Sequence, residues 1–431
     1  MNRPHTRWPL VLGIVLIATA SSRTATNQKL DIAVKDRANA YASLAASGQF
    51  AAIAWGASAK EATDIYVAVS RDGGRAFGTP TRVAGDARLA GEQPPRIALV
   101  PRAERSPAIV VVWTASTSGG TRLLSARSDD EGRTFTPPAP LPGSDASGNR
   151  GWESVATNRS GGVVALWLDH RETATGRRDG APMNHAEHQH LESSQRPADG
   201  VARAQLSKLW FATLGGAESP KALTGGVCYC CKTTIATDST GAIYAAWRHV
   251  YEGNVRDIAF TKSSDDGRSF TPPLRVSDDN WVLDGCPENG PTMVVDGAKR
   301  IHIVWPTLVP GATQNSEPTL ALFYAMSVDG KRFTARQRIS TDGVPRHPQM
   351  IVDPKGGLTV AWDEQAKGTR RIALARGSVG ANGVARFVKQ PIGDAVRAEY
   401  PALALTSDGT LVAWTSGSVG QTALRTERIS N

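Results

Sequence analysis

Ser128-Asp129-Asp130-Glu131-Gly132-Arg133-Thr134-Phe135 is the stretch that decides the fold, because the same pattern returns along the chain. Close copies are Ser70–Phe77 and Ser264–Phe270, and Ser327–Phe333 is a looser one. In each copy the aspartate and serine side chains can bond backbone N–H groups of a turn, and glycine accepts a positive φ. The aromatic residue that follows can pack back under the turn. The pattern therefore predicts a turn that closes one strand of a repeating unit.

A second repeated feature is an apolar strand that ends in tryptophan. Glycine-containing turns such as Ser160-Gly161-Gly162 and Lys355-Gly356-Gly357 separate it from a preceding apolar strand, which is typical of a hairpin. Aromatic residues repeated in this way are expected to pack in the core between units. The tryptophans are Trp55, Trp113, Trp167, Trp247, Trp305, Trp362 and Trp414.

The repeated turn resembles the Asp-box (BNR) repeat of the sialidase-like superfamily. That resemblance implies an all-β fold, a β-propeller of four-stranded antiparallel blades. The seven tryptophan-ended hairpins predict seven blades; the sialidases themselves have six, and six is the alternative. The last repeat shows three clear strands, so Leu30–Val34 is expected to supply its fourth strand and close the ring.

The N-terminus is typical of an export signal. Arg3, His5 and Arg7 precede the apolar run Trp8–Ile17, and Ala18-Thr19-Ala20 has the form of a cleavage site. We therefore expect residues 1–20 to be a signal peptide, and the mature protein to be periplasmic or extracellular without a membrane anchor. Residues 21–431 are expected to form a single propeller domain, with a long His-rich loop inserted at about 169–203.

The formal charge of +9 over 431 residues is spread thinly, without a block of basic residues. This distribution argues against a nucleic-acid partner. Strand alternation places the repeated turns on one face of the ring, and the loops between blades on the other. Irregular loops on a rigid scaffold commonly carry function, so the second face, at the mouth of the central channel, is the predicted site. The expected partner there is a small ligand or a metal ion, or else a partner protein.

Three of the four cysteines stand together as Cys228, Cys230 and Cys231, and the fourth is Cys286 one repeat later. Structural disulfides are one interpretation, because an exported protein meets oxidising conditions. A thiolate site for a soft metal, copper or zinc, is the second. A redox-active dithiol is the third. The sequence leaves all three open.

The His-rich loop contains a second candidate group of ligands. His and Met side chains in an exported protein suit copper, whereas a solvated loop is the structural alternative. If this loop folds over the channel mouth, its ligands and the cysteines form one metal site. The candidate ligands are Met183, His185, His188 and His190.

The sialidase resemblance implies a different site, in which arginines clamp a carboxylate and a glutamate assists a tyrosine nucleophile. The candidates for these roles are Glu399, Tyr400, Arg256 and Arg346. The Phe-Arg-Ile-Pro segment of those enzymes is absent, which puts a sialidase activity in doubt. Three functions follow as hypotheses: a propeller that binds a soft metal at its mouth, a sialidase-type glycoside hydrolase acting on acidic sugars, and a disulfide-stabilised interaction scaffold.

Overall fold

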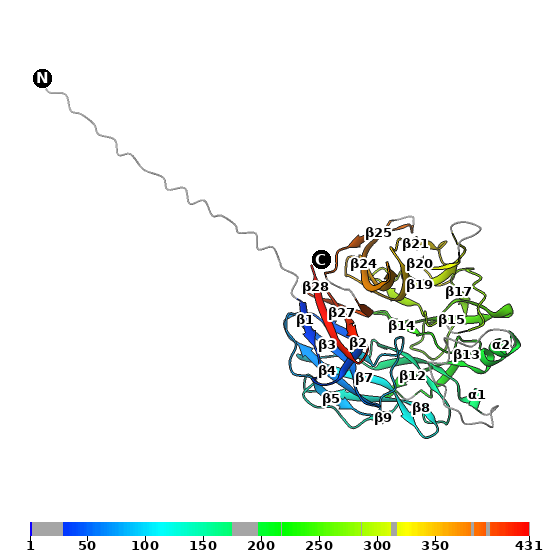
Figure 1. The fold of residues 1–431 in the computed structure, drawn as a ribbon, viewed down its shortest axis with the longest axis horizontal. Helices are drawn as coiled ribbons and strands as arrows, with labels where there is room; N and C mark the ends of the chain where they lie inside the picture. The colour runs from blue at the N-terminus through cyan, green and yellow to red at the C-terminus, as the bar shows by residue number, and fades with distance from the viewer. Residues whose placement is uncertain are drawn as a thin grey trace.

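Seven four-stranded antiparallel sheets form the protein, one for each tryptophan-ended hairpin. The computed structural model describes residue 1 and residues 29–174, 197–216, 218–285, 287–311, 317–380, 383–393 and 397–430. Figure 1 shows the sheets as blades that follow one another around a ring. The prediction of a seven-bladed propeller is confirmed, and the six-bladed alternative is wrong.

Six blades are built from consecutive strands, and the first-named strand of each lies innermost. The strands of these six blades are β2 (Ala38–Ser47), β3 (Phe50–Ala59), β4 (Ala62–Ser70) and β5 (Thr81–Ala84); β6 (Arg96–Arg102), β7 (Arg105–Thr117), β8 (Gly120–Ser128) and β9 (Ala139–Pro140); β10 (Arg150–Thr157), β11 (Val163–Asp169), β12 (Lys208–Leu214) and β13 (Lys221–Thr224); β14 (Thr234–Thr237), β15 (Ile243–Tyr251), β16 (Val255–Ser263) and β17 (Leu274–Arg275); β18 (Thr292–Val295), β19 (Ile301–Val309), β20 (Thr319–Ser327) and β21 (Gln337–Ile339); and β22 (Val344–Val352), β23 (Leu358–Ala366), β24 (Thr369–Val379) and β25 (Ala385–Gln390).

The seventh blade joins the two ends of the chain. It consists of β26 (Ala398–Thr406), β27 (Gly409–Ser418), β28 (Gln421–Ile429) and β1 (Lys29–Ile32). β1 pairs antiparallel with β28, from Lys29 opposite Glu427 to Ile32 opposite Leu424. The expected closing strand is therefore present, and Figure 1 shows β1 beside β28.

In the residues that the structure describes, the helical segments are short. α1 (Arg171–Ala174) and α2 (Pro197–Leu206) lie between β11 and β12, and the 3-10 turn η2 (Glu252–Asn254) precedes β16. Residues 175–196, which include Met183, His185, His188 and His190, lie outside the described residues. None of the described helices is long and apolar enough to cross a membrane.

The seven tryptophans occupy the second strand of each blade and are at most 1 % exposed. They fill the space between neighbouring sheets; Trp113 of β7, for example, packs in one cluster with Ile65 and Val67 of β4. The prediction that they form the core is confirmed. Burying seven indole rings between blades fixes the geometry of the ring on which the mouth loops stand.

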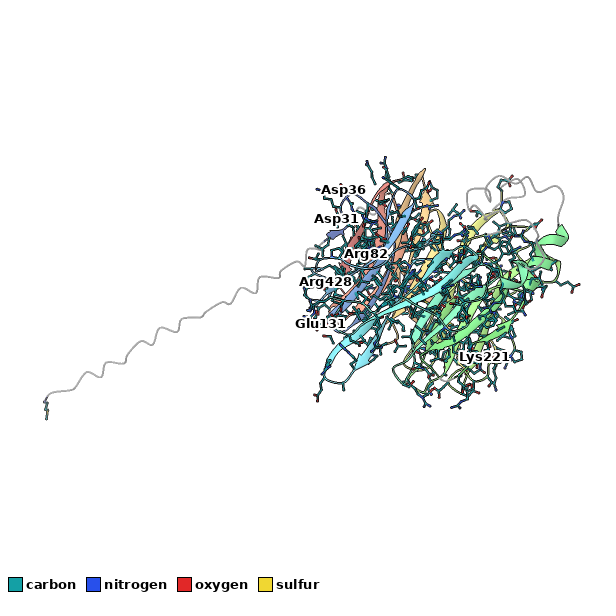
Figure 2. The ribbon with its side chains drawn as sticks, turned by 90° about the horizontal axis from the view of Figure 1, so that it is seen from below. Asp31, Asp36, Arg82, Glu131, Lys221 and Arg428 are labelled. Carbon is teal, nitrogen blue, oxygen red and sulfur yellow. The ribbon has the colours of Figure 1, made fainter. Side chains whose placement is uncertain are left out.

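The repeated turns have the predicted hydrogen bonds. In the second copy Asp130 Oδ1 accepts the backbone N–H groups of Arg133 at 3.1 Å and Thr134 at 2.9 Å, while Ser128 Oγ accepts the N–H of Gly132 at 2.8 Å. Gly132 has a φ of +81°. In the third copy the serine in this role is Ser263, one position before the expected residue. Figure 2 shows Glu131, from such a turn, and Asp36, which precedes β2, toward opposite faces of the ring.

Asp130→Ala is expected to lower the free energy of unfolding by about 1–2 kcal/mol, comparable to the loss of a strong helix cap, because two backbone N–H groups lose their acceptor. Urea unfolding followed by tryptophan fluorescence measures the change. Asp129→Ala is the control, since Asp129 is exposed and makes only surface ion pairs with Arg102 and Arg127, so its loss should cost less than about 0.5 kcal/mol. Equal effects of the two changes would contradict the assigned role.

Candidate functional site

Four innermost strands carry the same irregularity where they reach the mouth. The pairing of β2, β10, β22 and β26 with their neighbours shifts register there, as at a β-bulge. At each shift a non-glycine residue has a left-handed backbone: Tyr41 (φ 60°), Trp152 (φ 54°), His347 (φ 49°) and Tyr400 (φ 54°). Such conformations are costly for bulky residues and cluster at functional sites. The mouth is therefore the candidate site.

Three of these four residues touch one another across blades six, seven and one. The rings of His347 and Tyr400 are 4.4 Å apart, and those of Tyr400 and Tyr41 are 5.2 Å apart. His347 Nδ1 lies 2.6 Å from Asp363 Oδ1, so its N–H donates to the carboxylate. This bond fixes the ring and leaves Nε2 as the nitrogen that can accept a proton. We call Tyr41, His347, Asp363 and Tyr400 the mouth cluster.

The charges around the mouth cluster keep its phenols protonated. Burial, followed by the charge of Glu399, raises the pKa of Tyr400 and the pKa of Tyr41 above their usual value. Glu399 itself accepts a hydrogen bond from Arg370 at 2.6 Å, and Arg370 also faces Asp363 at 3.4 Å. The two tyrosines are therefore proton donors at neutral pH, and both nearby carboxylates are engaged by Arg370.

Gly91, in the loop before β6, lies directly against Tyr400. A Cβ atom added at Gly91 would come within 2.1–2.4 Å of the Tyr400 ring and hydroxyl. Under the cluster is a small pocket of about 10 Å³, lined by Tyr41, Gly91, His347 and Tyr400 together with residues of the central channel. The space at Gly91 is thus what lets the Tyr400 side chain lie over the channel.

The four residues predicted from the sialidase resemblance are not brought together as one clamp. Glu399 and Tyr400 lie at the mouth as described, and Arg346 is half-buried beside His347, with no hydrogen-bond or ion-pair partner among the described residues. Arg256 is fully buried. Its Nη1 donates to Cys228 Sγ at 3.1 Å and its Nε to the Leu283 carbonyl at 2.7 Å, so its donors point into the protein.

The cysteines lie on the other side of the mouth, at the entry to the fourth blade. Cys228 and Cys231 are buried free thiols with sulfur atoms 3.5 Å apart. Cys230 is disulfide-bonded, and its sulfur is 4.0 Å from that of Cys228. Cys286 lies outside the described residues. The disulfide interpretation thus holds for Cys230, while Cys228 and Cys231 are free thiols, for which the metal site and the redox dithiol stay hypotheses.

The two thiols differ in their affinity for protons. Burial raises the pKa of Cys228, but the hydrogen bond from Cys231 and the charges of Arg256 and Arg248 outweigh it, so the pKa is lowered. Burial and the neighbouring Cys228 raise the pKa of Cys231. The thiolate is therefore favoured at Cys228, beside Arg256, and disfavoured at Cys231.

Buried histidines nearby are neutral. Burial lowers the pKa of His170 to about 4, and does the same to His249. His170 Nδ1 lies 2.9 Å from Ser207 Oγ, and its ring packs edge-on against Trp152. In the unfolded chain both histidines bind a proton as the pH falls below about 6.5. In the folded chain they stay neutral until the pH falls to about 4.

The free energy of unfolding should therefore fall as the pH drops from about 6.5 to 4, by about 3 kcal/mol for each of these two histidines. Urea unfolding at steps between pH 7 and pH 4 measures the slope. His170→Gln, which cannot charge, should show a flatter profile than the native chain over this interval. A profile of the same steepness in this variant would contradict the role assigned to His170.

The fold can now be compared with known proteins. No protein-family model and no curated protein sequence matches the chain. Among solved structures it is similar to an ulvan lyase of polysaccharide lyase family PL25 (TM-score 0.55, 10% identity, covering 92% of this chain and 94% of the other). It is also similar to the GH93 α-L-arabinofuranosidase of Fusarium graminearum (TM-score 0.50, 12% identity, covering 94% of this chain and 97% of the other). At such identities the likeness shows the propeller fold alone.

Sequence reasoning named only part of this site. The sequence predicts Glu399, Tyr400 and Arg346 as site residues, but not His347, Asp363, Tyr41 or Gly91. A signal was present, because all four left-handed residues stand fourteen or fifteen positions before a repeated tryptophan. When the repeats are aligned on their tryptophans, Tyr41 and Tyr400 fall at the same position of the repeat.

Proposed function

We propose that the protein is a carbohydrate-active enzyme whose active site is the mouth cluster, and that it acts on an acidic polysaccharide by acid–base chemistry. The observation that carries the proposal is the contact of three strained residues, Tyr41, His347 and Tyr400, around a histidine held by a buried carboxylate. Strain kept at one position in several blades, on residues that can move protons, is the expected mark of an active site.

The residues have distinct roles in this proposal. His347, oriented by Asp363, takes a proton through Nε2, and the protonated Tyr400 hydroxyl donates to the leaving oxygen. Arg346, which has no partner among the described residues, is placed beside His347 to hold a carboxylate or sulfate of the substrate. Removal of a proton next to a uronate carboxylate, followed by β-elimination, is the reaction that fits this set.

Elimination fits better than hydrolysis of the sialidase type. A hydrolase needs two carboxyl groups, or a glutamate free to assist a tyrosine. Here Asp363 is committed to His347, and Glu399 to Arg370. The ulvan lyase with the same fold is a polysaccharide lyase, and the arabinofuranosidase was solved in complex with arabinobiose, so both structures support a sugar as the substrate class.

The test is a panel of uronate-containing polysaccharides, with a fluorogenic sialoside beside them. Elimination produces an unsaturated uronate that absorbs near 235 nm, so absorbance and new reducing ends should rise together on at least one polymer. Reducing ends without this absorbance would replace the lyase with a hydrolase. Turnover of the sialoside would restore the sialidase assignment, and no turnover on any polymer would remove the enzymatic proposal.

A second candidate function, binding of a soft metal, rests on the thiol pair. Cys228, Cys230 and Cys231 present sulfur atoms within 4.8 Å of one another, and two of these are free thiols. Two thiolates are soft ligands suited to copper(I) or zinc. The charge of Arg256 at 3.1 Å opposes a cation there, which is why this candidate stands second. Elemental analysis of protein purified without chelator, compared with Cys228→Ser, would show or refute stoichiometric copper or zinc.

A further inference from the structure

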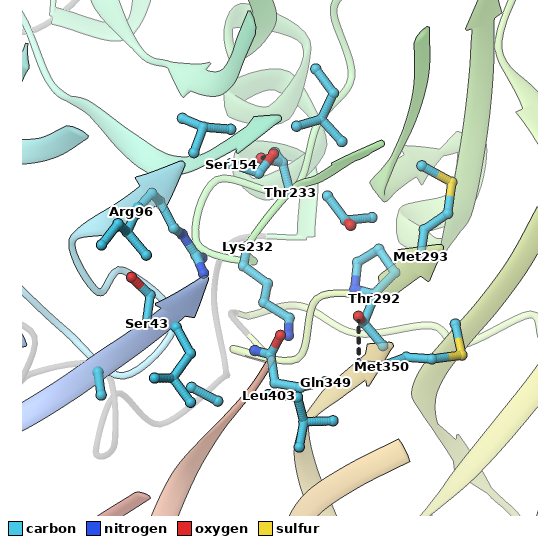
Figure 3. Close-up of a pocket in the computed structure, with 18 residues that line it drawn as sticks. Ser43, Arg96, Ser154, Lys232, Thr233, Thr292, Met293, Gln349, Met350 and Leu403 are labelled. Carbon is cyan, nitrogen blue, oxygen red and sulfur yellow. Dashed lines mark hydrogen bonds between the residues drawn. The ribbon is translucent and has the colours of Figure 1, made fainter. Parts of the chain in front are cut away.

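The centre of the ring holds a cavity of about 190 Å³, which shares Arg96, Lys232 and Gln349 with the small pocket under the mouth cluster. Residues of all seven innermost strands, or of the loops that lead into them, line it (Figure 3). One water molecule needs only about 10–15 Å³ of such space, so the cavity has room for a small polyatomic ion together with water. Its polar lining residues are Ser43, Arg96, Ser154, Lys232, Thr233, Thr234, Thr292 and Gln349.

Two cationic side chains enter this cavity from different blades. Arg96 begins β6, Lys232 stands just before β14, and Figure 3 shows their charged ends turned toward the same space. Lys232 is only 3 % exposed. Buried cations are normally paired with carboxylates, because removing a charge from water is costly.

Within the described ranges of the chain, neither cation forms a hydrogen bond or a close ion pair with a carboxylate. Lys232 Nζ donates to the Pro348 carbonyl at 2.5 Å. Arg96 donates through Nε to the Glu153 carbonyl at 2.7 Å and through Nη2 to the Glu92 carbonyl at 3.3 Å. All of these acceptors are neutral backbone groups. Arg96 Nη1 and two hydrogens of the Lys232 ammonium are left to bind something else.

The nearby acidic groups are committed elsewhere. The Glu92 carboxylate accepts the backbone N–H of Lys232 at 2.9 Å and that of Gly290 at 2.8 and 3.0 Å. Burial raises the pKa of Glu153 to about 7, so this carboxyl group holds its proton for much of the time at neutral pH. Asp363 is held by His347 and Arg370. The cavity thus holds two cations, and the Glu92 carboxylate acts on both of them without a hydrogen bond to either side chain, so an excess of positive charge is left. Burial lowers the pKa of Lys232 to about 8.

We propose that the central cavity binds a small inorganic oxyanion, phosphate or sulfate, between Arg96 and Lys232. A guanidinium group and an ammonium group are the donors that such an anion selects. The Thr292 hydroxyl accepts the N–H of Met350 at 3.2 Å and keeps its own hydrogen to donate, and the Gln349 amide lines the same space. The bound anion neutralises the centre of the ring and connects residues of four blades.

Isothermal titration calorimetry on the full chain tests the proposal. Potassium phosphate and potassium sulfate are titrated in a zwitterionic buffer, with potassium chloride at matched ionic strength as the reference. At least one oxyanion should bind saturably with one ion per chain, and chloride should bind at least about ten-fold more weakly. No saturable binding of either oxyanion, or equal binding of chloride, would overturn the proposal.

Gln349→Glu locates the site, because it places a carboxylate inside the cavity with almost no change in shape. Oxyanion affinity should fall at least about ten-fold, and the melting temperature in anion-free buffer should rise. Gln421→Glu makes the same change on an exposed hairpin and should leave both quantities unaltered. Unchanged oxyanion affinity in Gln349→Glu would place the binding elsewhere and refute the cavity site, independently of whether the mouth cluster is catalytic.

Discussion

Tyr400→Phe is expected to lower kcat/KM for polysaccharide cleavage by a factor of about 10²–10⁴, the usual contribution of a positioned acid or base. The phenol is protonated, since burial raises its pKa, and its ring is fixed against His347 and Tyr41. Phenylalanine keeps these ring contacts and removes only the proton donor. Initial rates at 235 nm, on the polymer identified by the substrate panel, give the ratio.

Tyr66→Phe is the matched control for this experiment. Tyr66 lies on β4 and stacks against Trp55 within the first blade, away from the mouth cluster. Its loss of a hydroxyl should leave kcat/KM within a factor of two or three of the native value, by the ordinary size of surface effects. If Tyr400→Phe behaved like Tyr66→Phe, with the native melting temperature kept, the mouth cluster would not be the site of proton transfer.

Glu92→Ala is expected to produce the largest loss of stability, about 3–5 kcal/mol in the free energy of unfolding. Glu92 is 4 % exposed, and its carboxylate connects the loops that enter the fourth and fifth blades by accepting the N–H groups of Lys232 and Gly290. Alanine would leave both donors buried without an acceptor and remove a carboxylate whose charge acts on both Lys232 and Arg96. Urea unfolding at pH 7 measures the change.

Two further variants make that result interpretable. Glu92→Gln keeps one acceptor oxygen and should lose less stability than the alanine variant. Glu61→Ala removes an exposed carboxylate from the hairpin between β3 and β4 and should change stability by no more than about 0.5 kcal/mol. A loss below about 1 kcal/mol in Glu92→Ala would mean that water replaces the carboxylate at the centre of the ring.

The architecture could be predicted because its signals are local and repeated. Each tryptophan lies within the second strand of one blade, and each Ser-x-Asp turn is held by its own neighbours, as the bonds of Asp130 show. The blade number and the closing strand β1 followed from counting these units. In the third copy of the turn the prediction was wrong by one residue, since Ser263 and not Ser264 accepts the N–H of Gly267.

The site was harder to predict because its contacts cross between strands and blades. Asp363 meets His347 only because β23 pairs with β22 in a particular register, and Tyr41 meets Tyr400 only because the ring closes. Among the cysteines, nothing in the spacing distinguished Cys230, which forms a disulfide, from Cys228 and Cys231, which remain thiols. That distinction depends on the course of a loop, for which local sequence patterns give no rule.

The pairing of β1 with β28 also sets an order for folding. Six blades are made of contiguous sequence and can form hairpin by hairpin, whereas the seventh must wait until segments near both ends of the chain are available. Joining Lys29 to Glu427 closes a loop of almost the whole chain, yet the entropy of closure grows only with the logarithm of loop length. The pairing of β1 with β28 should therefore come late in folding, but its entropic cost is moderate. At high protein concentration, β1 of a second chain can pair with β28 instead. Exchange of β1 between two rings is therefore a form of misassembly that this pairing allows.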